Sequence, residues 1–113
     1  MNREIKFRAW DKLSKEMSYN VERSGQFGFM LKNFTCMQFT GLKDKHGKNL
    51  YEGDIVQGYR GNQKFKSDIF FIKYSEQSFV MAGNKDDEKM DCIWFYDFEI
   101  IGNIFEDPKL MKL

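Results

Sequence analysis

The chain has 113 residues, an apolar fraction of 42%, a charged fraction of 31% and a formal net charge of +1. These values are typical of one folded domain with a modest hydrophobic core, and they exclude a disordered chain and a global polycation for nucleic acid. No stretch approaches the roughly 18 uninterrupted apolar residues of a membrane span, and the mixed charges of the first residues do not fit a signal peptide, so we expect one cytoplasmic domain over residues 1–113 without membrane association.

The first elements along the chain predict a β-hairpin. Residues 5–9, Ile-Lys-Phe-Arg-Ala, alternate apolar and charged side chains, and this period of two indicates a strand with one buried face. Residues 17–21 alternate again after a polar connection. Two glycines at positions 25 and 28 then interrupt the pattern.

Residues 34–56 predict two strands and two tight turns. A strand over residues 34–40 leads into Asp44-Lys45-His46-Gly47, where the Asp carboxylate can accept a backbone N–H and Gly can adopt a left-handed conformation. We expect a hairpin here, with a bulge at Gly47. Glu52-Gly53-Asp54 predicts the second turn, and a strand follows it.

The second half of the chain predicts short strands separated by loops. Gly58 to Asn62 indicates a loop, and Asp107-Pro108 indicates at most one turn of helix near the C-terminus. Gly102-Asn103 predicts a bulge inside one strand, because a hairpin there leaves very short arms. The expected strands cover residues 69–72, 79–82, 92–96 and 100–105.

About seven short strands with turns every eight to twelve residues predict the fold class. We expect a mainly β protein with little helix, built as a small antiparallel barrel or sandwich. Aromatic residues make up 17% of the chain, and rings pack well on sheet faces.

Three segments of the sequence resemble the YopX family of phage and prophage proteins. The first is Arg3-Glu4-Ile5-Lys6-Phe7-Arg8-Ala9-Trp10-Asp11, and the second runs from Met37-Gln38-Phe39-Thr40-Gly41-Leu42 to Tyr51-Glu52-Gly53-Asp54-Ile55-Val56. The third is Ile101-Gly102-Asn103-Ile104-Phe105-Glu106. This resemblance implies a phage or prophage origin, a bacterial host, an SH3-like barrel element and self-association into a homo-oligomer. It implies no reaction and no catalytic residue.

Catalytic and metal-binding chemistry finds little support in the residues. A nucleophilic thiol needs a nearby base, and the only imidazole, His46, lies in a predicted turn far along the chain from Cys36 and Cys92. Both cysteines sit in apolar strand segments, where Cys commonly acts as a small buried side chain. Zinc needs three or four ligands at a characteristic spacing, which these residues do not supply. We therefore expect no enzyme activity, no metal and no cofactor.

A cationic stretch over residues 59–66 makes nucleic-acid binding an open alternative. Its Lys and Arg side chains can follow a phosphate backbone while its rings stack on bases. The same pattern is typical of an edge strand whose lysines discourage aggregation. The candidate residues for this function are Lys43, Lys45, Lys48, Tyr59, Arg60, Lys64 and Lys66.

Protein binding is the function that we rank first from sequence. Large rings anchor protein interfaces, and we expect Trp10, Trp94 and Tyr96 to be the candidate anchors for an unknown host or phage protein. Residues 1–74 carry fourteen Lys and Arg against eight Asp and Glu, whereas residues 75–113 carry four against nine. This asymmetry can steer an acidic partner to one end of the protein or pair two copies head to tail, unless folding mixes the two halves and cancels it.

Overall fold

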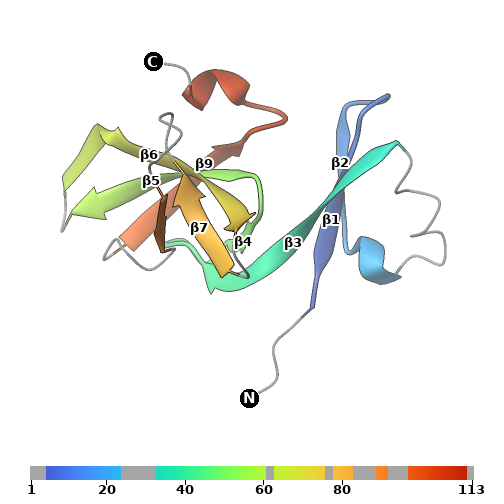
Figure 1. Ribbon diagram of the computed structural model, residues 1–113, viewed down its shortest axis with the longest axis horizontal. Coiled ribbons are helices and arrows are strands. Elements are labelled where there is room, and N and C mark those ends of the chain that lie inside the picture. Colours follow the sequence, from blue (N-terminus) through green and yellow to red (C-terminus); the bar gives the residue numbers. More distant parts are fainter. Residues whose placement is uncertain are drawn as a thin grey trace.

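Two antiparallel sheets, joined by one long strand, make up the computed structural model (Figure 1). It describes residues 5–23, 33–60, 63–75, 78–82, 89–91 and 97–111. The first sheet has the strand order β2-β1-β3-β4 and the second has the order β8-β7-β6-β5-β9. The prediction of a mainly β, antiparallel fold with a barrel element and little helix is confirmed, because the second sheet curls into a half-barrel.

The N-terminal lobe contains β1 (Phe7–Asp11), β2 (Glu16–Tyr19), the 3₁₀ helix η1 (Val21–Arg23) and the first half of β3 (Phe34–Lys43). β1 pairs with β2 in the predicted hairpin, and its other edge pairs with β3 from Phe7↔Gln38 to Asp11↔Phe34. The second half of β3 leaves this lobe and pairs with β4 (Asn49–Tyr51). In Figure 1, β3 crosses from the lobe on the right to the half-barrel on the left.

The half-barrel contains the remaining elements. They are β5 (Asp54–Arg60), β6 (Gln63–Ser75), β7 (Ser78–Ala82), β8 (Lys89–Asp91), β9 (Asp97–Asn103) and the 3₁₀ helix η2 (Pro108–Met111). Their inward side chains form the core together with residues of β3 and β4, which close one side of the curl. The core consists of Leu50, Val56, Phe70, Ile72, Met81 and Phe98, with Leu42, Phe79 and Ile100 packed against it.

The predicted turns are largely confirmed. Gly47 and Gly53 adopt φ values of 82° and 86° in the two expected turns, and a short helix follows Asp107. The irregularity in β9 is also the predicted bulge, because Ile55 pairs with Gly102 while the next residue of β5 pairs with Ile100.

Three local predictions are wrong. The irregular register of the β3–β4 hairpin lies between Phe39 and Lys43, where Gly41 has a φ of 91°, rather than at Gly47. The expected loop at Gly58 is instead part of β5, which continues to Arg60 after a register shift. The alternating pattern of β1 placed Arg8 on the exposed face, yet this residue is 3% exposed.

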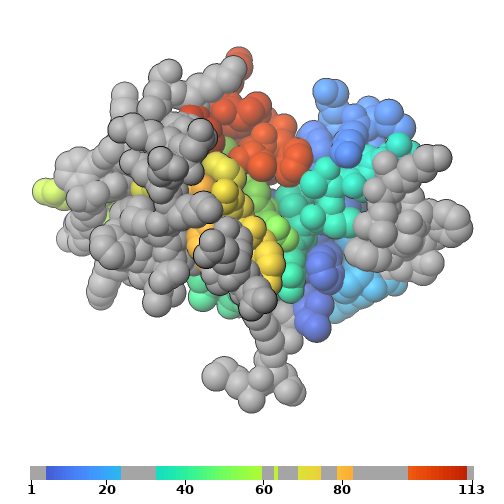
Figure 2. Space-filling view, viewed as in Figure 1, coloured from blue at the N-terminus to red at the C-terminus, as the bar shows by residue number. Residues whose placement is uncertain are grey.

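Neither short 3₁₀ helix has the length or hydropathy of a membrane-spanning helix, and these are the helices of the described ranges. The strand predicted over residues 92–96 and the glycines at 25 and 28 lie outside the described residues. The space-filling view places β3 between the blue N-terminal lobe and the red C-terminal segment (Figure 2).

Candidate functional site

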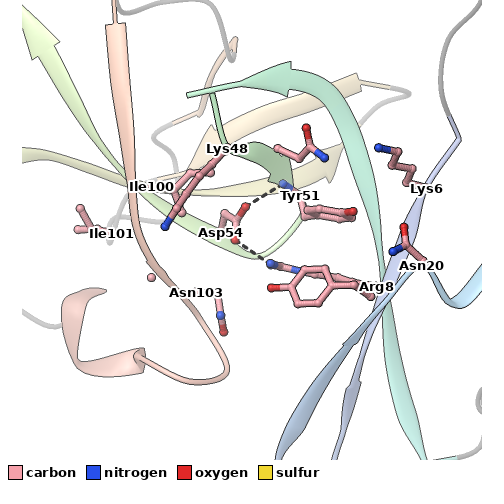
Figure 3. A pocket seen from close by; sticks show the side chains of 12 residues that line it. Lys6, Arg8, Asn20, Lys48, Tyr51, Asp54, Ile100, Ile101 and Asn103 are labelled. Carbon is pink, nitrogen blue, oxygen red and sulfur yellow. Dashed lines mark hydrogen bonds and ion pairs between the residues drawn. The ribbon is translucent and has the colours of Figure 1, made fainter. Parts of the chain in front are cut away.

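An open pocket of about 570 Å³ lies where the N-terminal lobe meets the half-barrel (Figure 3). β1 and β2 supply one wall, β9 supplies the opposite wall, and the segment from residue 48 to 54 lies between them. We call it the inter-lobe pocket. It is lined by Lys6, Arg8, Tyr19, Asn20, Lys48, Asn49, Tyr51, Asp54, Ile100, Ile101, Gly102 and Asn103.

The turn over residues 51–54, which we call the joint turn, fixes the two lobes to each other. Glu52 binds β3 twice, because its backbone N–H donates to Gln38 O at 3.0 Å and its carboxylate accepts the Gln38 N–H at 2.8 Å. Gly53 N–H donates to Ile72 O of β6, and Gly53 O accepts the Ile104 N–H, both at 2.8 Å. The joint turn is therefore hydrogen-bonded to elements of both lobes.

A buried ion pair also crosses between the lobes at the base of the pocket. Arg8 Nη2 of β1 lies 2.9 Å from Asp54 Oδ1, and the two side chains are 3% and 4% exposed. The same Nη2 donates to Glu52 O at 3.0 Å, and Asp54 Oδ2 accepts the Tyr51 N–H at 2.8 Å. Burial raises the pKa of Asp54 above its ordinary value, and the guanidinium of Arg8 opposes part of that shift.

Aromatic rings pack around the guanidinium of Arg8. Its central carbon lies 4.9 Å from the ring centroid of Tyr51 and 6.0 Å from that of Tyr19. Phe39 contacts Tyr51 from β3, with 5.6 Å between the ring centroids. Burial raises the pKa of the Tyr51 hydroxyl above its ordinary value. One wall of the pocket is thus a fixed stack of rings and guanidinium.

Of the three rings predicted to anchor a protein partner, the structure describes only Trp10. Trp10 is half-buried and stacks on Phe105 with 5.7 Å between centroids, so its ring packs the two lobes together. Trp94 and Tyr96 lie outside the described residues. The exposed aromatic side chains of the described part are instead Tyr19 and Tyr74, each 53% exposed.

The predicted cationic candidates are partly brought together. Lys45 Nζ lies 3.9 Å from the ring centroid of Tyr59, which joins the β3–β4 hairpin to β5. Glu99 introduces an acid at this place, because it accepts the Tyr59 hydroxyl at 3.2 Å and lies 2.9 Å from His46 Nε2. Lys43 is exposed away from the pocket, whereas Lys48 lines it. The side chains of Arg60, Lys64 and Lys66 are outside the described part, although their backbones lie in β5 and β6.

Cys36 and His46 lie in different parts of the fold. Cys36 pairs with Ala9 in the N-terminal lobe, whereas His46 is held against Glu99 of the half-barrel. Burial raises the pKa of the Cys36 thiol, which is the opposite of what activates a nucleophile. Cys92 lies outside the described residues, and within the described residues no three His, Cys, Asp or Glu side chains gather in a way that could hold a metal ion.

Sequence reasoning named only one residue of the inter-lobe pocket, Lys48, as a candidate binding residue. It missed Arg8 because the alternating pattern of β1 assigned that side chain to solvent. It also interpreted Asp54 only as a turn residue. Nothing in the spacing of Arg8 and Asp54 signals a pair, since 45 positions separate them and the lobe arrangement alone brings them together.

A comparison with family models now identifies the chain. The model of the YopX protein family matches residues 22–112. The chain belongs to the YopX family. The crystal structure of protein EF1440 from Enterococcus faecalis has a similar fold, with a TM-score of 0.68, 24% sequence identity, and coverage of 98% of this chain and 100% of that chain. A search of curated proteins returns no match.

The three segments that carry the YopX resemblance meet at the inter-lobe pocket. The first contributes Arg8, the second contributes Tyr51 and Asp54, and the third contributes Gly102 and Asn103. The first segment lies before residue 22, outside the region that the family model matches. The interpretation of residues 1–113 as one domain stays a prediction.

Proposed function

We propose that this YopX family member is a non-enzymatic accessory protein of phage or prophage origin, which binds a partner protein or a second copy of itself in the host cytoplasm. The observation that carries the proposal is the inter-lobe pocket, which is preformed and open and presents fixed polar and aromatic side chains. Its volume of about 570 Å³ suits part of a polypeptide.

The chemistry of the pocket supports recognition over catalysis. Acid–base catalysis uses groups that gain and lose a proton near neutral pH, in contact with the substrate. An arginine guanidinium keeps its charge in proteins. The Asp54 carboxylate already pairs with Arg8 and accepts the Tyr51 N–H. Both groups therefore hold the lobes together, which leaves the pocket wall as a binding surface.

Tyr19 is the residue best placed to anchor a partner. Its ring is 53% exposed at the edge strand β2, lines the pocket and makes an edge contact with Tyr51. Tyrosine is enriched at energetically important interface positions because it combines a large apolar ring with a polar tip. We expect Tyr19→Ala to abolish partner capture or oligomer formation without unfolding the protein.

The test is affinity purification from prophage-bearing cells, together with light scattering of the purified protein. Wild type, Tyr19→Ala and Lys12→Glu are compared, because Lys12 is exposed and does not line the pocket. The proposal requires a bound protein or an oligomer that Tyr19→Ala loses and Lys12→Glu keeps. If all three proteins yield the same partners and the same oligomeric state, the proposal is wrong.

Nucleic-acid binding is the second candidate, favoured by the contact of Lys45 with Tyr59. This contact places a lysine of the hairpin beside the cationic stretch of residues 59–66, although Glu99 weakens the positive potential there. A gel-shift titration at low and high salt tests it, because an interaction with phosphates weakens steeply as salt rises. Absence of a shift at low salt rejects this candidate.

A further inference from the structure

Three of the four edge strands of the two described sheets lie at the inter-lobe pocket. The strand orders place β2 and β4 at the edges of the first sheet, and β8 and β9 at the edges of the second. The pocket lining includes Tyr19 of β2, Tyr51 of β4 and Ile100 of β9. An edge strand presents backbone N–H and C=O groups with which another extended chain can pair. The pocket is therefore a place where a strand can be added.

Turns of this chain already cover β9 and β4 beside the pocket. The β3–β4 turn donates the Lys45 N–H to Phe98 O of β9 at 2.9 Å. The same turn accepts the Ile100 N–H on the Asp44 carboxylate at 3.0 Å. The Tyr51 N–H of β4 donates within the joint turn at 2.8 Å. Of the three edges at the pocket, β2 is the one to consider for an added strand.

The hydrogen bonds of β1 show which of its residues face β2. Lys6 O accepts the Phe39 N–H of β3 at 2.9 Å, so Lys6 and the residues two and four positions along direct their backbone groups to β3. The residues between them direct theirs to β2. The Phe7 N–H agrees with this alternation, because it donates to the side chain of Glu22, which follows β2.

Two residues of β2 direct their backbone groups to the open edge. Ala9 faces β2 and pairs with Ser18, so the neighbours of Ser18, which are Met17 and Tyr19, direct their N–H and C=O groups away from β1. In the described part of the chain, these groups have no hydrogen-bond partner on that side. The strand contains no proline, no lysine and no register shift, and its short length is the one feature that protects it from pairing.

The face of β2 that carries Tyr19 points to the half-barrel. Arg8 is the cross-strand partner of Tyr19, so the two side chains share a face, and Arg8 reaches Asp54 of the half-barrel. The Tyr19 ring is 53% exposed on this face. A strand added to β2 directs alternate side chains to the same face, where apolar ones pack against the ring.

We propose that an extended segment of a partner protein pairs with the open edge of β2 and lies along the inter-lobe pocket (Figure 3), with apolar residues at alternate positions facing Tyr19. This proposal rests on the protein-binding function proposed above and specifies how the partner is held. The main chain of the segment exchanges hydrogen bonds with Met17 and Tyr19, which gives affinity, and the pocket selects its side chains.

The surroundings of β2 favour a single strand over the β2 of a second copy. One strand needs about 4.8 Å beside its neighbour. A second copy would bring the rest of its first sheet and its half-barrel together with its own β2. Because β9 forms the opposite wall of the pocket, the other lobe limits the space beside Tyr19.

Titration of the full chain with a model strand, followed by amide NMR, tests the proposal. The probe is the end-blocked peptide Lys-Val-Thr-Val-Thr-Val-Lys. Two control peptides carry N-methyl groups, one on its valines and the other on its threonines, so that each lacks the N–H groups along one of its edges. The protein is wild type, Met17→Pro or Met17→Ala.

Met17→Pro removes an outward N–H of β2 and keeps the pairing with β1, because proline is tolerated in an edge strand where its nitrogen faces away from the neighbouring strand. Met17→Ala is the matched control, since it removes the same side chain and keeps the N–H. Thermal unfolding checks that both variants are folded. The N-methylated peptides test the same hydrogen bonds without changing the protein.

We expect the probe to shift the amide signals of Met17 and Tyr19 at millimolar concentration or below. Met17→Pro should weaken binding about tenfold because one inter-strand hydrogen bond is lost, and Met17→Ala should weaken it less than about threefold. One of the two N-methylated peptides should not bind, because its methyl groups face β2.

The proposal is wrong if the probe does not bind, if it shifts signals away from β2, if Met17→Pro and Met17→Ala bind it equally, or if both N-methylated peptides bind as well as the probe. An oligomer that Met17→Pro dissociates, without probe binding, would identify a second copy as the occupant and also overturn the proposal.

Two further results separate this proposal from the proposed function. A cellular partner captured equally by Met17→Pro and Met17→Ala would refute strand pairing and leave the protein-binding function standing. Probe binding at β2 without any cellular partner or oligomer would refute the proposed function alone.

Discussion

The hairpin turn over residues 44–47 and the joint turn have similar chemistry and different surroundings. Each combines an Asp with a Gly at positive φ, 82° for Gly47 and 86° for Gly53. Three backbone N–H groups donate to Asp44, and although burial opposes the shift, they lower the pKa of this carboxyl. Burial raises the pKa of Asp54. One turn thus stabilises a hairpin, whereas the other joins two lobes.

The largest expected effect comes from breaking the ion pair of the joint turn. Arg8→Met leaves Asp54 as a buried carboxylate without its cation, and Asp54→Asn leaves the guanidinium without its anion. Removing one member of a buried pair costs about 3–5 kcal/mol. We expect either single variant to lower the free energy of unfolding by this amount, measured by urea denaturation.

The double variant Arg8→Met with Asp54→Asn measures the interaction between these two side chains apart from their other contacts. Since neither charge is then buried alone, the double variant should be more stable than the sum of the single effects predicts, by about 1–3 kcal/mol. Strictly additive losses would show that the two side chains act independently and that the lobes are held by other contacts.

Alanine at the two glycines compares the turns directly. A side chain at positive φ costs roughly 1–2 kcal/mol wherever it occurs. At Gly47 nothing lies within 4 Å of an added Cβ, but at Gly53 the Cβ meets Met37 Sδ at 3.0 Å between the lobes. We expect Gly47→Ala to lose about 1–2 kcal/mol and Gly53→Ala to lose about 1–3 kcal/mol more, because it also overpacks the lobe contact.

The measurement is again the urea midpoint of each variant. Gly47→Ala is the matched control, since it reports the backbone strain without the clash. Equal losses at the two positions would mean that Met37 moves aside freely and that the joint turn is no more constrained than the hairpin turn.

The same two turns show how far the sequence predicts this protein. Asp-Gly patterns are local, so both turns and most strands were predictable from residues within a few positions of each other. The partner of Asp54 is Arg8 in another strand, and only the arrangement of the lobes brings them to 2.9 Å. The inter-lobe pocket could not be predicted for the same reason, because its walls come from four separate segments.

The pH dependence of the free energy of unfolding distinguishes Asp44 from Asp54, and here the expected effects are smaller than those of breaking the ion pair. The pKa of Asp44 is lowered below 3.8, so its hydrogen bonds stabilise the folded protein above that pH and are lost as the pH falls through the lower folded pKa. Asp44→Asn should cost about 1–2 kcal/mol at neutral pH. It should also lose less stability on acidification than wild type, measured by urea unfolding at a series of pH values.

Asp54 should show the opposite dependence. Its folded pKa is raised, so its contribution to stability falls as the pH rises from 3.8 through the folded value. Asp54→Asn removes this contribution and should therefore lose stability more steeply than wild type on acidification. If Asp44→Asn and Asp54→Asn both increase or both decrease the loss of stability on acidification relative to wild type, the contrast between the two turns is wrong.

The smallest expected effect concerns the side chain at the tip of the hairpin turn. His46 Nε2 lies 2.9 Å from Glu99 Oε2, but the two side chains are 56% and 28% exposed, and surface pairs contribute little. The backbone N–H of His46 already donates to Asp44, and this bond does not depend on the imidazole. We expect His46→Asn to change the free energy of unfolding by less than about 0.5 kcal/mol, well below the change at Asp44. A loss as large as that of Asp44→Asn would show that the imidazole, rather than the Asp44 carboxylate, fastens the hairpin to β9.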